Sequence, residues 1–135
     1  MNYIDSQKNI LKEVLAEIRF LKKKDGHIDF FNRCKGMKGW PHHPMRELSI
    51  GSFNSRLNHK IDGNSTLNLK QLLMQANDKI VILNEYRKPY KKDKVNSFWQ
   101  DQIKDGNVEQ ALEDLEGFLN KAKNEINTKF KVRLD

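Results

Sequence analysis

Hydrophobic residues recur at spacings of three and four near the start of the chain, which predicts an amphipathic helix from about Ser6 to Lys24. Its apolar stripe consists of Leu11, Val14, Leu15, Ile18 and Leu21. A shorter helix, with Asp29 as its cap, is expected to follow. Its buried residues are predicted to be Phe30, Phe31 and Cys34. Residues 35–44 contain two glycines and two prolines and are predicted to form a loop, and Pro44 suits the first position of the next helix.

The segment from Ser49 to Asn58 differs in character from the other predicted helices. Its apolar residues Ile50, Phe53 and Leu57 form one narrow stripe. Most of its other residues are Ser, Gly and Asn, which are poor helix formers, whereas a solvated helix face usually carries Glu and Lys. Small polar side chains beside an arginine suit close approach to a base edge or a phosphate. We therefore predict a DNA-recognition helix, with an ordinary weak helix as the alternative. The residues predicted to contact DNA are Ser49, Gly51, Ser52, Asn54, Ser55, Arg56, Asn58, His59 and Lys60.

The middle of the chain is predicted to continue as helix after a turn at residues 59–66. Asn68 is the expected cap of one helix and Asp78 the expected cap of another, which Pro89 ends. The run Ile80–Leu83 is β-branched enough to form a short strand instead. Because no second clear strand is available to pair with it, we predict a helix.

Residues 95–135 are predicted to form a helical hairpin that turns at Asp105 and Gly106. The apolar residues of its second helix are Val108, Leu112, Leu115, Leu119, Ala122 and Ile126. These faces can close on the rest of the chain or pair between protomers, and we favour a homodimer. The predicted fold is thus all-α, a compact helical bundle with a helix-turn-helix element followed by the hairpin. Its expected parts are a DNA-binding domain (1–88), a basic linker (89–94) and an association hairpin (95–135).

Charge changes this picture because it is unevenly distributed. The 135 residues include 25 Lys and Arg against 18 Asp and Glu. Residues 1–94 hold 19 of these basic and 10 of these acidic side chains, whereas residues 95–135 hold 6 and 8. The basic first part favours an anionic partner, although a solvated, charge-rich surface without a ligand is the plain alternative.

The cysteine count and the lengths of the apolar runs further limit the class of protein. A single cysteine excludes a disulfide within the chain and is compatible with a reducing cytosol. Neither a secretory signal nor an apolar run long enough for a membrane span is present, so a cytoplasmic protein without membrane contact is expected.

Candidate chemistry is sparse. The chain has no Gly-rich phosphate loop, no nucleophile elbow and no Cys-x-x-Cys pair. Cys34, His42 and His43 are of zinc-ligand type, but adjacent histidines on an extended chain point apart and a second cysteine is lacking. We therefore predict no catalytic residue, no metal and no cofactor. Trp40 is expected to close a loop over the core rather than to stack on an unpaired base.

The order of several short motifs resembles the CII-like regulatory proteins of temperate phages. The motifs are Leu48–Asn58, read as the turn and recognition helix of a helix-turn-helix, then Leu67–Leu73, Ala76–Asp78 and Lys104–Val108. The resemblance covers about residues 48–126. It implies a prophage-encoded transcription regulator with a lambda-repressor-like helical domain.

The leading hypothesis is therefore a sequence-specific regulator that binds double-stranded DNA. The alternative is a small basic protein-binding module, such as a phage inhibitor or an assembly factor, without sequence-specific DNA binding. A nuclease or other small enzyme ranks third because the spacing of Asp, Glu and His supports no active site.

Overall fold

Helices form all the regular secondary structure of residues 3–36, 40–62, 64–88 and 97–133, which are the residues that the computed structural model describes. In chain order these helices are α1 (Tyr3–Lys22), α2 (His27–Lys35), α3 (Ile50–Lys60), α4 (Leu67–Arg87), α5 (Ser97–Lys104) and α6 (Asn107–Lys129). The predicted all-α class is confirmed. Within the described ranges, no helix is long and apolar enough to cross a bilayer.

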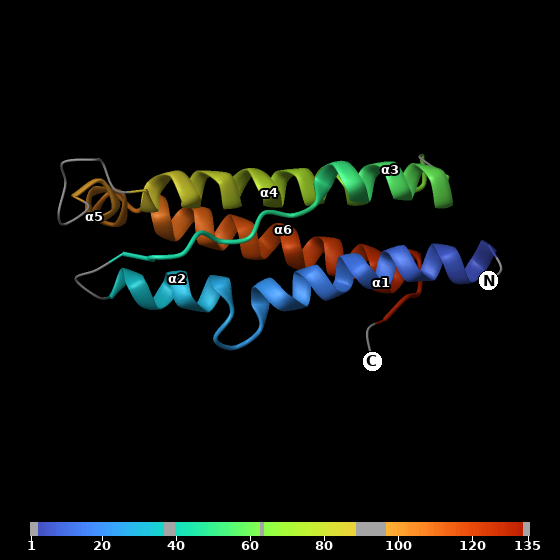
Figure 1. Ribbon diagram of the computed structural model, residues 1–135, viewed down its shortest axis with the longest axis horizontal. Helices are drawn as coiled ribbons and strands as arrows, with labels where there is room; N and C mark the ends of the chain where they lie inside the picture. The colour runs from blue at the N-terminus through green and yellow to red at the C-terminus, as the bar shows by residue number, and fades with distance from the viewer. Residues whose placement is uncertain (1–2, 37–39, 63, 89–96, 134–135) are drawn as a thin grey trace.

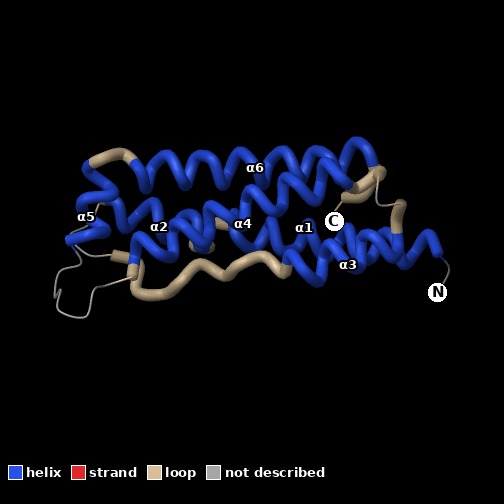
Figure 2. The backbone as a smooth tube through the Cα atoms, turned by 90° about the horizontal axis from the view of Figure 1, so that it is seen from above, coloured by secondary structure: helices blue, strands red, loops and turns tan. Residues whose placement is uncertain are grey.

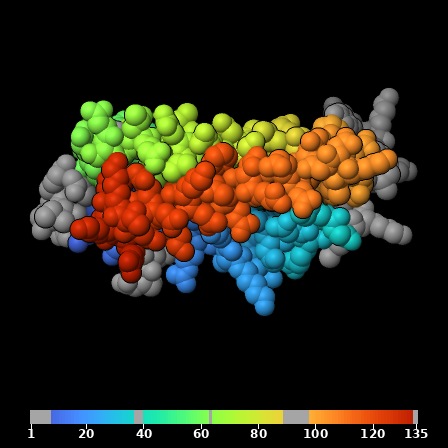
Figure 3. All heavy atoms as spheres, turned by 180° about the vertical axis from the view of Figure 1, so that it is seen from behind, coloured from blue at the N-terminus to red at the C-terminus, as the bar shows by residue number. Residues whose placement is uncertain are grey.

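The bundle is elongated (Figure 1). The two longest helices, α4 and α6, run antiparallel and make the most extensive helix–helix contact. The helices α1 and α2 follow one another in a row beside α6. Seen from behind, α6 runs along the bundle between α4 and this row (Figure 3). At one end α3 packs against α1 and α4, and at the other end α5 joins α4 to α6 (Figures 1 and 2).

The predicted apolar stripes form one continuous core. Every residue of the stripe on α1 is at most 4% exposed, and the stripe on α6 is buried as well. Trp99 of α5 is fully buried at one end, with its ring edge-on to Phe31 at 6.0 Å between centroids. This core includes residues on both sides of the predicted linker 89–94, which itself lies outside the described residues. The apolar face of α6, from which the homodimer was expected, is buried against the same chain.

Four predicted helix boundaries are wrong. Asn68 is not a cap, because α4 begins at Leu67 after Thr66 and Asn68 lies in its first turn. Asp78 does not begin a new helix, because the apolar stripe of α4 continues without a break through Ala76, Ile80 and Leu83. The run Ile80–Leu83 is accordingly helical, as predicted. The second helix begins at His27 after a Gly26 cap, and Asp29 lies in its first turn.

The fourth wrong boundary is Pro44, which begins no helix and lies in an extended segment, residues 40–49, that we call the strap. The strap runs between the α1–α2 row and α4 and ends where α3 begins (Figure 1). It buries the side chains of Met45 and Leu48. An extended chain leaves its own backbone groups unpaired, and side chains of α4 bind some of them.

The turn between α1 and α2 requires a glycine. A Cβ atom added at Gly26 would lie 2.7 Å from the carbonyl oxygen of Lys23 and 2.8 Å from that of Phe20. Real Cβ atoms do not approach backbone oxygens so closely, so any side chain here would force α1 and α2 apart.

Candidate nucleic-acid interface

The predicted recognition helix is α3, and it presents a small, polar surface to solvent. Phe53 and Leu57 are 5% and 0% exposed and anchor the helix against α1 and α4. Partly buried Ile50 completes this narrow stripe. Six of the predicted contact residues are exposed on the remaining surface: Ser49, Gly51, Ser52, Ser55, Asn58 and His59. The local pattern therefore folds as expected, with its apolar residues inward and its small residues outward.

The charge of α3 is entirely positive. The helix contains Arg56, His59 and Lys60 and no carboxylate. Arg56 forms an ion pair across to Glu13 of α1, and the two side chains are 43% and 50% exposed. An exposed pair of this kind is worth about 0–1 kcal/mol, so a phosphate can replace the Glu13 carboxylate at small cost.

Besides Arg56, Asn58 is bonded within the protein and Asn54 is half-buried. The side-chain oxygen of Asn58 accepts a hydrogen bond from the ammonium of Lys70 in α4. Asn54 is half-buried, and its Oδ1 atom is buried without a hydrogen-bond partner in the described part of the chain. Asn54 is thus directed partly inward and is a poorer candidate for base contact than Ser52 or Ser55.

The chain arrives at α3 through the strap rather than through a helix. The preceding helix, α2, ends at Lys35 at the far end of the bundle (Figure 1). After α3, Asn64, Ser65 and Thr66 form a turn that leads into α4, and the amide of Ser65 donates to the carbonyl of Asp62 at 3.0 Å. A helix-turn-helix element built on α3 stays a prediction.

The other residues with candidate chemistry are Cys34, His42, His43 and Trp40. Cys34 is buried in the core, and burial raises the pKa of its thiol, which opposes the thiolate form. His42 and His43 are exposed. Trp40 is partly buried against the core, with its ring 5.4 Å from that of His42. Among the residues that the structure describes, no three His, Cys, Asp or Glu side chains form a metal-binding group.

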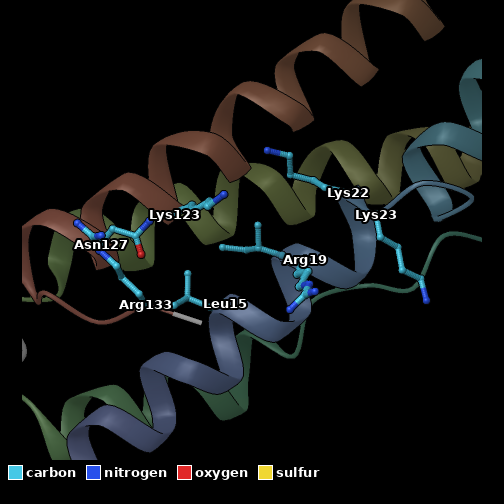
Figure 4. A pocket seen from close by; sticks show the side chains of 8 residues that line it. Leu15, Arg19, Lys22, Lys23, Lys123, Asn127 and Arg133 are labelled. Carbon is cyan, nitrogen blue, oxygen red and sulfur yellow. The ribbon is translucent and has the colours of Figure 1, made fainter. Parts of the chain in front are cut away.

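A cluster of cations that sequence reasoning missed lies on the other side of α1. Arg19 and Lys22 of α1 lie across a groove from Lys123 of α6, and Arg133 closes one end of it (Figure 4). Lys23, which follows α1, also lines the groove, but its side chain points away from Lys123 and its ammonium lies over the Phe20 ring, 5.0 Å from the centroid. These residues come from segments about 100 positions apart, so no local pattern points to them. In Figure 2 α1 and α3 lie on the same side of α6. Because α1 meets α3 through Glu13 and meets α6 through Lys22, the groove and the exposed face of α3 are separate surfaces.

No protein-family model, no curated protein and no solved structure matches this chain.

Proposed function

We propose that this protein binds duplex DNA through the exposed face of α3 and acts as a transcription regulator of the prophage type. The observation that supports this most is the composition of that face. A firmly anchored helix of 11 residues, without a carboxylate, exposes Gly51, Ser52 and Ser55 side by side. Small residues let a helix backbone approach the bases, and a major groove admits a helix of this size.

In this proposal the small and the charged residues have different roles. The hydroxyl groups of Ser52 and Ser55 lie on the exposed face, where they can hydrogen-bond to base edges. Arg56 and Lys60 flank them and neutralise phosphates, which positions the helix without reading sequence. Arg56 exchanges its exposed partner Glu13 for a phosphate when DNA binds.

The test is selection of bound duplexes from a random pool at moderate salt. The proposal predicts enrichment of a defined sequence. It also predicts that log Kd rises linearly with log salt concentration, with a slope of about 0.9 per phosphate neutralised. Failure to enrich any sequence, together with no duplex binding at low salt, would overturn the proposal.

A further inference from the structure

A groove of about 580 Å³ lies between α1 and α6 (Figure 4). Leu15 and Ile18 form an apolar part of its lining. Its cationic lining consists of Arg19, Lys22, Lys23, Lys123 and Arg133. A volume of this size is typical of sites for small molecules.

The positive charge of the groove follows from the distribution of charged side chains around α1. At 100° per residue, Lys8, Lys12 and Arg19 lie along one side of α1, next to Leu15 and Lys22, which line the groove. Glu13 and Glu17 lie on the opposite side, where they form ion pairs with Arg56 of α3 and Arg46 of the strap. Glu13 and Glu17 are thus used within the fold, whereas Arg19 and Lys22 remain on the groove side.

The cations of the groove are poorly neutralised. None of the five is in an ion pair within the described ranges, and no carboxylate is among the residues that line the groove. Lys22 donates a hydrogen bond to the side-chain oxygen of Asn120, which is neutral. Burial, together with the nearby charge of Lys123, lowers the pKa of Lys22, and Glu116 only partly offsets this. The fold therefore holds like charges together here, with Glu116 as a partial counter-charge and no carboxylate in the lining of the groove.

We propose that this groove binds a small polyanion that carries two or more phosphate groups. Arginine and lysine together suit phosphate, because the guanidinium donates two parallel hydrogen bonds and the ammonium adds a mobile point charge. A ligand with several negative charges is required because one phosphate leaves most of the five cations uncompensated. Leu15 and Ile18 exclude water from one wall, which strengthens the charge interactions inside. The site is independent of DNA binding at α3, because the groove and the exposed face of α3 are separate surfaces.

Thermal unfolding of the full chain in inorganic triphosphate, pyrophosphate and phosphate at constant ionic strength tests this inference. A ligand that binds only the native state raises Tm in proportion to the logarithm of its concentration. We expect triphosphate to raise Tm most and phosphate least, with citrate, a carboxylate polyanion, below pyrophosphate. No rise with triphosphate would overturn the inference, and an equal rise with citrate would overturn the assignment to phosphate.

The Lys123→Gln variant tests whether the rise in Tm comes from binding of triphosphate in the groove. Lys123 is exposed, so the variant folds, and it removes a charge that opposes protonated Lys22. We expect roughly tenfold weaker triphosphate binding, since one charge-assisted contact is lost. The matched control is Lys121→Gln, an exposed lysine on the same helix that does not line the groove, and it should bind triphosphate as the wild type does. Equal binding by wild type and Lys123→Gln would overturn the site.

Duplex binding provides the test of independence. Lys123→Gln should retain wild-type affinity for any duplex that the protein binds, and triphosphate should not displace that duplex. If the variant lost duplex affinity and triphosphate competed with DNA, the groove would be the site of the nucleic-acid backbone, which contradicts a separate small-ligand site. Triphosphate binding without any duplex binding would instead leave this inference standing and remove the proposed function.

Discussion

The side-chain amide of Asn84 binds both backbone groups of Met45. Its oxygen accepts from the Met45 amide at 2.7 Å, and its nitrogen donates to the Met45 carbonyl at 2.8 Å. Two helical turns earlier, Asn77 accepts from the amide of Leu48, also at 2.7 Å. The two asparagines thus supply hydrogen-bond partners to the backbone of the strap, as a neighbouring strand does in a sheet. They hold the strap at the point where α3 begins, so the position of α3 depends on them.

The Asn84→Ala variant is expected to lose about 1–3 kcal/mol of unfolding free energy, because it leaves two part-buried backbone groups without partners. Urea unfolding measures this loss. Asn124→Ala, at an exposed position on α6, is the matched control and should change stability by less than about 0.5 kcal/mol. Equal stabilities of the two variants would show that the strap is not held by Asn84.

Removing the partner of Arg56 should strengthen DNA binding. In Glu13→Gln the Arg56 guanidinium no longer has to leave a carboxylate before it contacts phosphate. Because an exposed ion pair is worth at most about 1 kcal/mol, duplex affinity should rise by roughly two- to fivefold. Fluorescence anisotropy with the selected duplex measures this change.

The control for that experiment is Glu17→Gln. It removes the same charge from the same helix, one turn further along, but frees Arg46 of the strap rather than a residue of α3. A general effect of net charge would raise the affinity of both variants equally, and that outcome would argue against phosphate contact by Arg56.

Stability should fall below about pH 6.5 because of His27. Burial, with the nearby charges of Arg46 and Lys23, lowers the pKa of this imidazole, whose ring contacts that of Phe20 at 5.1 Å between centroids. The unfolded chain therefore binds a proton at a higher pH than the native protein does, so the unfolding free energy decreases as the pH falls through 6.5, the ordinary pKa of a histidine side chain. Urea unfolding between about pH 7.5 and 5.5 should show a flatter dependence for His27→Gln than for wild type. An identical dependence in both proteins would exclude His27 as the cause.

The Cys34 thiol should react slowly in the native protein. It is 6% exposed in the core, and burial raises its pKa, so both access and thiolate formation are opposed. A chromogenic disulfide reagent should modify the native chain much more slowly than the chain in denaturant. Similar rates in the two conditions would contradict the buried position of Cys34.

Hydrophobic periodicity predicts the helices whose packing depends on an apolar stripe of their own. The stripes on α1 and α6 are buried as expected because each residue at the right spacing meets the same core. The strap could not be predicted, because its stability comes from Asn77 and Asn84, which in sequence look like solvent-exposed polar residues of a helix. The proline of the strap, Pro44, instead suggested a helix start.

The two candidate sites also differ in how far the sequence alone predicts them. The surface of α3 is local in sequence, so its small residues could be recognised before the fold was known. The groove combines Lys22 with Lys123, and only the packing of α1 on α6 brings them together. The sequence does not indicate the pairing of Arg56 with Glu13 either, although this ion pair affects how readily Arg56 can bind a phosphate.

The most direct test of DNA contact by α3 is the duplex affinity of Ser52→Asp. Ser52 is exposed and is the third residue of α3, where a negative charge favours the helix dipole, so this variant should fold at least as stably as wild type. The matched control is Asn124→Asp, which adds the same charge at an exposed position on α6. We predict that Ser52→Asp binds the selected duplex at least roughly tenfold more weakly than the control, because a carboxylate then faces the bases and phosphates. Equal affinities of the two variants would contradict DNA binding through α3.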